Sequence, residues 1–187
     1  LQSLERIRNH MKIIEIQERT PALLQSLLEI WENSVRATHL FLSGPEIEQI
    51  KSYVPQALEA IPHLIVAVNE NESPVGFMGI DGQKLEMLFI SSGERGKGTG
   101  KQLINYGIQA YSVRELAVNE QNPLAKGFYE HMGFHIYKME AVVSLRRFEN
   151  MIKRFLKYVD GKKECYFCIL NLNKLSEPVP AARRDCT

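Results

Sequence analysis

Apolar residues recur at helical spacing between Thr20 and Leu40. Thr20-Pro21 fits a helix cap followed by a proline in the first turn, where the missing N–H costs nothing. The positions on one face of this predicted helix are Leu23, Leu24, Leu27, Leu28, Trp31 and Val35. Ser43-Gly44-Pro45 interrupts the pattern and starts a second predicted helix, from Glu46 to about Ala60, which Pro62 ends.

Short apolar runs in the rest of the chain predict strands. They lie at about 12–16, 64–68, 75–80, 85–90, 113–118 and 134–143. Two amphipathic segments between them, at about 98–110 and 123–132, predict further helices. The chain has 187 residues, the length of one ordinary domain with a single core.

The C-terminal part has a different pattern. At about 145–158 an apolar stripe lies opposite a basic one, which predicts an inserted amphipathic helix. Its basic side is either a solvated face or a contact for a lipid or a partner. Cys165–Leu172 predicts a last strand. We therefore expect one domain over 11–172, with 1–10 as a leader or an expression remnant and 177–187 as a flexible tail.

Charge and composition narrow the classes of partner. Lys and Arg number 23 against 22 Asp and Glu, so no overall field favours nucleic acid or an anionic membrane. No apolar run approaches the roughly 20 residues that span a bilayer, and the first ten residues lack the features of a secretory signal. Three cysteines, an odd number, argue against a disulfide framework and for a reducing cytoplasm.

The strand predicted at 85–90 runs into a glycine-rich turn that opens a helix. Gly96, Gly98 and Gly100 remove side chains where backbone N–H groups converge on an anion. The following helix adds its first amides and the positive end of its dipole. Arg95 and Lys97 add flanking positive charge. The turn therefore predicts a phosphate site.

The spacing of this turn excludes two common phosphate motifs. A dinucleotide fingerprint, G-x-G-x-x-G, fails because Lys101 or Leu103 stands at its last position. A P-loop, G-x-x-x-x-G-K-[ST], fails because Arg95 stands first and Gln102 last. What remains is Arg95-x-x-Gly98-x-Gly100, which resembles the [Q/R]-x-x-G-x-[G/A] pyrophosphate loop of the GNAT superfamily of acyl-CoA-dependent N-acetyltransferases.

A second motif strengthens this resemblance. Asn122-x-x-Ala125-x-x-Phe128-Tyr129, followed by Gly133-Phe134, is similar to the second motif of the same family, in family order. The segment Ala37 to Leu42 looks closer still to the bacterial YjaB-type members. The resemblance implies a GNAT-like α/β (α+β) fold: a central mixed, mostly antiparallel sheet flanked by helices and splayed between the strands at about 113–118 and 85–90.

The resemblance also implies acetyl-CoA as cosubstrate and assigns residues to it by position. Backbone groups of the strand before the loop would hold the pantetheine arm. The residues concerned are Leu88, Phe89 and Ile90 for the arm, and Arg95, Gly96, Lys97, Gly98, Thr99 and Gly100 for the pyrophosphate. Asn122 would contact the arm as well, although an Asn before Pro123 also suits a helix cap.

Tyr129 is the candidate general acid. A phenol has a pKa near 10, similar to that of a thiol, so it can protonate a departing thiolate. The alternative role is that of an interior aromatic residue, as expected for Phe128 beside it.

Glu86 and His39 are candidates for the other side of the reaction. By strict alternation Glu86 shares a strand face with Leu88 and Ile90, where it would act as a base through water or remain a solvated carboxylate. His39 lies at the turn between the first two helices, where the family places its acceptor pocket. It would bind substrate, relay a proton or cap the turn. Trp31 and Phe41 are core residues or pocket wall.

The implied activity is transfer of an acetyl group from acetyl-CoA to a primary amine by direct attack in a ternary complex. No cysteine lies in the motifs, which argues against an acyl-enzyme. The acceptor is a protein lysine or N-terminus, or a small amine. A non-catalytic acyl-CoA sensor or interaction module is the alternative. We expect a monomer or homodimer, and no metal, since Cys165-x-x-Cys168 lacks a second pair and Gly133 separates His131 from His135.

Overall fold

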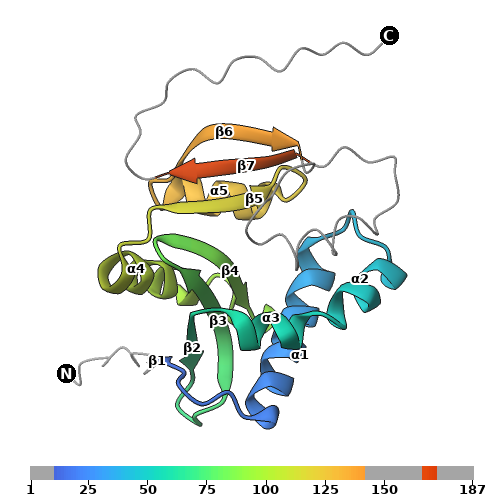
Figure 1. Cartoon of the computed structure of the whole chain (residues 1–187), viewed down its shortest axis with the longest axis vertical. Coiled ribbons are helices and arrows are strands. Elements are labelled where there is room, and N and C mark those ends of the chain that lie inside the picture. Colours follow the sequence, from blue (N-terminus) through green and yellow to red (C-terminus); the bar gives the residue numbers. More distant parts are fainter. Residues whose placement is uncertain (1–10, 142–165, 172–187) are drawn as a thin grey trace, which may run out of the picture.

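The computed structural model describes residues 11–141 and 166–171 (Figure 1). The leader at 1–10, the amphipathic helix at 145–158 and the tail at 177–187 lie outside the described residues, as does Cys165.

Seven strands form one sheet in the order β1-β2-β3-β4-β5-β7-β6. Their bounds are β1 (Lys12–Glu15), β2 (His63–Val68), β3 (Pro74–Asp81), β4 (Lys84–Ile90), β5 (Glu115–Asn119), β6 (His135–Ala141) and β7 (Tyr166–Asn171). Only the β4–β5 pair is parallel within this sheet of described strands. The mixed, mostly antiparallel sheet expected from the resemblance is confirmed, as is the last strand.

The sheet is splayed in its middle. β4 pairs with β3 along its length as far as Ile90, but with β5 only through Lys84 and Leu85. Beyond that point no described strand pairs with the second edge of β4, and β5, β6 and β7 form a separate group above β2–β4 in Figure 1. The expected splay is therefore confirmed, and it leaves backbone groups along one edge of β4 available to a ligand.

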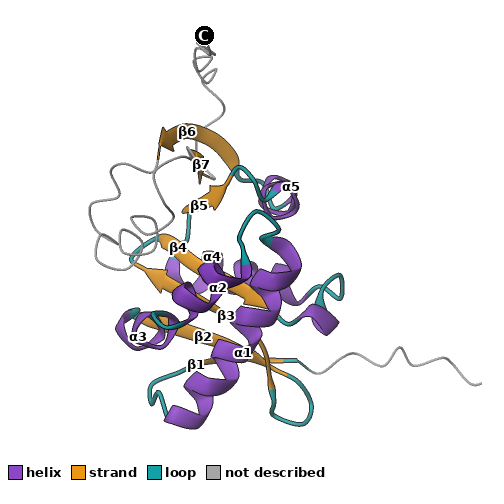
Figure 2. Ribbon diagram, turned by 90° about the vertical axis from the view of Figure 1, so that its right-hand side faces the viewer, coloured by secondary structure: helices purple, strands orange, loops and turns teal. Residues whose placement is uncertain are grey.

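Helices cover both faces of the sheet, as Figure 2 shows for α1 in front of β2 and β3. α1 (Pro21–Thr38), α2 (Gly44–Lys51) and α3 (Val54–Ala60) share one apolar cluster with Leu64 and Val66 of β2. α4 (Thr99–Tyr111) and α5 (Pro123–His131) share a second cluster with Ile65 and Ala67. Because successive side chains of a strand point to opposite faces, both faces of β2 are apolar and both are buried.

The second helix predicted from Glu46 to about Ala60 is wrong in one respect, because the structure divides it into α2 and α3. Pro55 is the physical reason. Proline has no N–H for an intrahelical bond, and its ring clashes with the carbonyl four residues earlier, that of Lys51. Pro55 therefore stands in the first turn of α3, where both penalties vanish.

The strict alternation of side chains between the two faces, assumed from the sequence for β4, is also wrong, because the strand contains a bulge at Glu86. Gly79 pairs with Met87 and the next residue, Ile80, pairs with Leu85, so the register skips Glu86. Accordingly, Leu85 and Leu88 pack in the same apolar cluster although they are three positions apart. The shared face assumed for Glu86, Leu88 and Ile90 therefore does not follow from spacing alone.

Candidate active site

The predicted phosphate turn follows β4 and the short 3-10 helix η1 (Ser92–Glu94), and it leads directly into α4. Gly96 and Gly98 have φ of 75° and 93°, a left-handed conformation that side chains rarely adopt. A Cβ built at either position would meet no heavy atom of the described residues within 4 Å. These two glycines thus make a turn with an open side, as the approach of a ligand to the backbone requires.

Gly100 has a different role. A Cβ at this position would lie 3.4 Å from Cζ of Phe128 and 3.8 Å from Cγ1 of Ile90. The missing side chain therefore lets α4 pack closely against α5 and the end of β4. Of the three glycines predicted to surround phosphate, the first two leave open space and the third permits helix packing.

The N-terminus of α4 presents backbone donors at this turn. The N–H of Gln102 donates to the carbonyl of Gly98 at 3.0 Å, which closes the first turn of the helix. The N–H groups of Thr99, Gly100 and Lys101 precede it and have no partner within the helix ladder. Together with the helix dipole they form a site suited to an anion.

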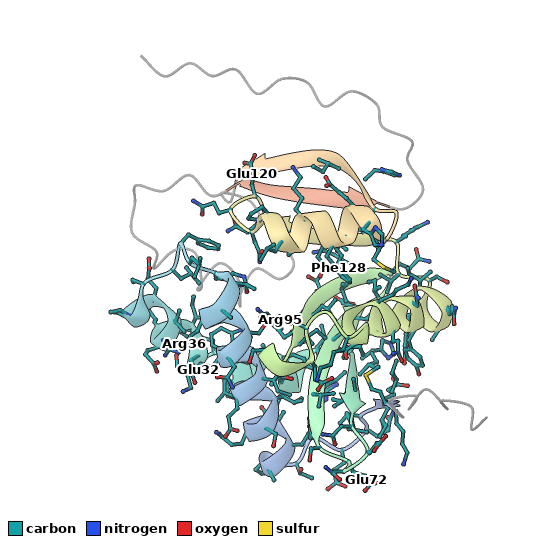
Figure 3. All side chains as sticks on the ribbon, turned by 180° about the vertical axis from the view of Figure 1, so that it is seen from behind. Glu32, Arg36, Glu72, Arg95, Glu120 and Phe128 are labelled. Atoms are coloured by element: carbon teal, nitrogen blue, oxygen red, sulfur yellow. The ribbon has the colours of Figure 1, made fainter. Side chains whose placement is uncertain are left out.

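The two basic residues of the turn point to protein partners. Nζ of Lys97 lies 3.0 Å from Oε1 of Glu94, and the Lys97 side chain is half exposed. Nη2 of Arg95 donates to the carbonyl oxygen and to Oγ of Ser34, both at 2.9 Å. Arg95 thus lies between the turn and α1, while Glu32 and Arg36 lie on the other side of that helix, where they pair with residues of α2 (Figure 3). A contact between Arg95 and phosphate remains a prediction.

His39 follows the last residue of α1, at the turn where the sequence predicted it. Its N–H donates to the carbonyl of Val35 at 2.8 Å, and its ring lies 5.4 Å from that of Phe41. Oγ1 of Thr38 is 2.9 Å from its Nδ1. Burial, with a smaller effect of the Arg95 charge, lowers the pKa of His39 to about 4. The imidazole is therefore neutral at neutral pH.

Trp31 and Phe41 differ in their surroundings. Trp31 is buried in the apolar cluster of α1, and its ring meets that of Phe89 on β4 edge-on at 6.5 Å. Phe41 is only partly buried and touches His39. Trp31 therefore takes the core role that the sequence left open, and Phe41 stands nearer the surface beside the histidine.

Tyr129 is buried on α5, in the cluster that joins α5 to β5. Its ring lies 5.1 Å from that of Phe128 and 6.0 Å from that of Phe134. Burial raises the pKa of the phenol, so the hydroxyl keeps its proton at neutral pH. The packing role is confirmed by these contacts. The raised pKa makes the phenol a weaker acid than free tyrosine, so burial alone does not give the pKa match with a thiol that the sequence suggested.

Asn122 caps α5. Its Oδ1 accepts a hydrogen bond from the N–H of Ala125 at 3.1 Å, and the residue is buried. The capping alternative from the sequence is confirmed. A contact to the cosubstrate remains a prediction, because the side-chain amide of a capping Asn still has donors of its own.

Glu86 stands at the bulge in β4 with its side chain only 8% exposed. Its Oε1 lies 2.9 Å from Nζ of Lys84. Burial raises the pKa of this carboxyl, and the nearby Lys84 opposes the rise. A buried carboxyl with a raised pKa is a better proton acceptor than a solvated one. This environment favours the role of a base over that of a solvated carboxylate.

Two residues at this site escaped sequence reasoning. Ser34 receives Arg95 from 61 positions away, and Thr38 contacts His39 through its hydroxyl. Both are ordinary polar residues of an amphipathic helix, so the sequence gives no signal that sets them apart. Within the described ranges no group of His, Cys, Asp or Glu could hold a metal ion, and no helix there is long and apolar enough to cross a membrane.

Known proteins resemble this chain in sequence. A family model described as an acetyltransferase (GNAT) domain matches residues 42–155. The peptidyl-lysine N-acetyltransferase YjaB of Salmonella typhimurium is 40% identical over 112 residues, which cover 60% of this chain and 77% of that protein.

Solved structures resemble it as well. The solution structure of apo-form YjaB from Escherichia coli has a TM-score of 0.70 and 31% identity, covering 88% of this chain and 99% of that one. The PaiA N-acetyltransferase of Thermoplasma acidophilum, solved in complex with coenzyme A, has a TM-score of 0.57 at 16% identity over 85% of this chain and 97% of that one. The second likeness supports the fold alone. The similarity thus extends from short motifs to most of the chain.

Proposed function

Because this chain belongs to the GNAT family of acetyltransferases, we propose that it transfers the acetyl group of acetyl-CoA to the ε-amine of lysine side chains in proteins. The single observation that carries the choice of acceptor is the 40% identity to a peptidyl-lysine N-acetyltransferase. Membership of the family makes the chain an enzyme, so the alternative of a non-catalytic sensor is not retained. Its cytoplasmic location and its state as monomer or homodimer remain predictions.

The turn before α4 fits the pyrophosphate of coenzyme A. Left-handed Gly96 and Gly98 leave open space, and the first amides of α4 point out of the helix end. Thr99 is buried at the first position of α4, and Lys97 lies half exposed at the rim, paired with Glu94. When bound, acetyl-CoA supplies an acetyl group activated as a thioester.

The free edge of β4 suits the pantetheine arm. Leu88, Phe89 and Ile90 pair with β3 on one side only, beyond the last contact with β5. Backbone N–H and C=O groups on the other side are already oriented by the strand, so they can bind an amide-containing arm and an oxyanion at little entropic cost.

Tyr129 and Glu86 divide the proton transfers in this proposal. The reaction forms a C–N bond and breaks a C–S bond, so one proton leaves the amine and one reaches the thiolate. The Tyr129 hydroxyl is protonated and donates, whereas the buried Glu86 carboxylate accepts, directly or through water. Since burial raises the pKa of Glu86, the acid limb of the pH profile of kcat/KM should show an apparent pKa above the ordinary carboxyl value. This limb should disappear in Glu86→Gln.

The proposal is tested by incubating the chain with acetyl-CoA and a library of lysine peptides. Thiol release and mass spectrometry should report acetylated lysine, and the Gly98→Glu variant at the same cosubstrate concentration should report much less. N-terminal peptides without lysine and small amines are the comparison acceptors. Thiol release with small amines and none with lysine peptides would refute the peptidyl-lysine assignment.

A further inference from the structure

Four polar residues connect the turn after β4 with the end of α1. Nη2 of Arg95 donates to the Ser34 carbonyl and to Oγ of Ser34 at 2.9 Å. Oγ1 of Thr38 donates to the same carbonyl at 2.8 Å and lies 2.9 Å from Nδ1 of His39. We call Ser34, Thr38, His39 and Arg95 the Ser34 network.

The geometry of this network fixes the proton on His39. A carbonyl oxygen only accepts, so the single proton of the Thr38 hydroxyl lies between Oγ1 and the Ser34 carbonyl. Oγ1 must then accept at its other contact, which places the imidazole proton on Nδ1. A neutral imidazole has one N–H, so Nε2 carries the lone pair.

The ring is held neutral by its surroundings. Burial and the Arg95 charge lower the pKa of His39 to about 4, and no hydrogen bond between described residues involves Nε2. The ring is partly exposed and rests on Phe41. Within the described part of the chain, Nε2 is thus a hydrogen-bond acceptor that the fold does not use.

His39 lies near the turn that follows β4, because the charge of Arg95 acts on its imidazole. Trp31 of α1 packs on Phe89 of β4, and Arg95 ties α1 to the turn that follows β4. His39 lies eight residues beyond Trp31, or about 12 Å farther along a helical rise of 1.5 Å per residue. The histidine therefore ends the helix that lines the C-terminal end of β4 on the face opposite α4 and α5.

We propose that Nε2 of His39 accepts a hydrogen bond from the N–H of the acceptor amine, and that Thr38 is the positioning residue that holds His39 in the Nδ1–H tautomer. The inference rests on the proposed transfer to an amine and extends it to the residue that orients that amine.

His39 orients the amine rather than taking its proton. An alkyl ammonium has a pKa near 10, so proton transfer to an imidazole with a pKa of about 4 would be unfavourable by about a million-fold. A lone pair that stays unprotonated can still hold an N–H in a fixed direction. The proton of the amine leaves through Glu86 or water, as in the proposed transfer above.

Steady-state kinetics test the contact. His39→Phe keeps an aromatic ring against Phe41 and removes the lone pair, so KM for a lysine peptide should rise on the order of 10-fold while KM for acetyl-CoA stays unchanged. His63→Phe is the matched control, because His63 lies on β2 and bonds Glu15 instead. It should leave both constants at the wild-type values.

Thr38 variants and a direct measurement test the tautomer. Thr38→Val keeps the β-branched shape without the hydroxyl and should raise the peptide KM, whereas Thr38→Ser should restore it. Long-range ¹H–¹⁵N correlation NMR on protein labelled at histidine should show Nδ1 protonated and Nε2 unprotonated at pH 7. The same spectrum of Thr38→Val should show a mixture of the two tautomers.

Two results would overturn the inference: a protonated Nε2 in the wild type, or a His39→Phe variant with unchanged KM for every acceptor. Failure of the proposed function looks different. If the wild type acetylates a small primary amine but no lysine peptide, and His39→Phe raises the KM for that amine, the acceptor assignment is wrong and the role of His39 stands.

Discussion

The turn before α4 and the end of α1 are joined by Arg95, yet they are built in different ways. The turn uses backbone amides of consecutive residues, and its key positions are glycines with no side chain to lose. The end of α1 uses side chains, three from within six residues of one helix end and one from 61 positions away. Each contact there depends on the identity and rotamer of a particular residue.

This difference fits the two ligands. One pyrophosphate is common to every acyl-CoA, so oriented backbone donors suffice to bind it. The acceptor amine arrives on a variable molecule, so its binding needs side-chain groups that can differ from one enzyme to the next. Substitutions should therefore divide into those that affect the cosubstrate and those that affect the acceptor.

The largest effect should come from Tyr129→Phe, which removes a proton donor without affecting either binding region. Loss of a general acid lowers turnover by about 10²- to 10⁴-fold. The ring contacts with Phe128 and Phe134 persist in the variant, so its melting temperature and acetyl-CoA affinity should match the wild type. Tyr106→Phe on α4 is the control. A decrease of less than a few-fold, with chemistry rate-limiting, would reduce Tyr129 to a packing residue.

Gly98→Glu should weaken the binding of acetyl-CoA by about 10- to 100-fold, because it places a side chain and a negative charge beside the predicted phosphate site. Gly82→Glu is a close control. Gly82 is also left-handed, with φ of 59°, and a Cβ there meets no described atom within 4 Å. Both variants place a side chain at a position of positive φ, so calorimetry should separate this kind of backbone strain from phosphate binding. Equal affinities in the two variants would remove the phosphate site from the turn.

The pH dependence of stability should reveal the neutral His39. Its pKa is about 4 in the folded chain and near 6.5 in the unfolded chain, so the unfolded state binds more protons between these values. The contribution to stability is complete above pH 6.5 and decreases as the pH falls toward 4, by up to about 1.4 kcal/mol per pH unit. Urea unfolding of His39→Phe should lack this contribution. Parallel pH curves for the two proteins would show that His39 titrates normally.

Ser34→Ala should have the smallest effect. It removes one of the two acceptors for Arg95 and leaves the carbonyl, so the loss of unfolding free energy should be about 1 kcal/mol. Ser26→Ala on the exposed side of α1 is the matched control, because its hydroxyl bonds the carbonyl of Ala22 within the same helix. Thermal unfolding should show a lower melting temperature for Ser34→Ala than for Ser26→Ala. A reversed order would mean that the tie between the turn and α1 does not stabilise the fold.

The difference between the turn before α4 and the end of α1 also explains which features could be predicted from the sequence. The turn from Arg95 to Gly100 is contiguous, so its glycines, spacing and helix start are visible in the residues, and family membership followed from them and from the motif at Asn122 to Phe134. The mixed, mostly antiparallel sheet and its splay came from the resemblance and are confirmed. The division of the second helix follows from Pro55, a single residue that disfavours a helix interior but suits a first turn.

The acceptor side was predictable only as single residues. His39 was singled out, but its neutral charge, its tautomer and its ties to Thr38 and Ser34 depend on the tertiary contact with Arg95. The bulge at Glu86 is likewise a property of pairing with β3, which alternation in one strand does not contain. Roles that depend on contacts between distant segments need the folded chain.

Two-substrate kinetics of Gly98→Glu, His39→Phe and the double variant test the division of the site most directly. We expect a higher KM for acetyl-CoA alone in Gly98→Glu, a higher KM for the lysine peptide alone in His39→Phe, and additive free-energy changes in the double variant. A single substitution that raised both KM values to the same extent would contradict the separation of a backbone-built cosubstrate site from a side-chain-built acceptor site.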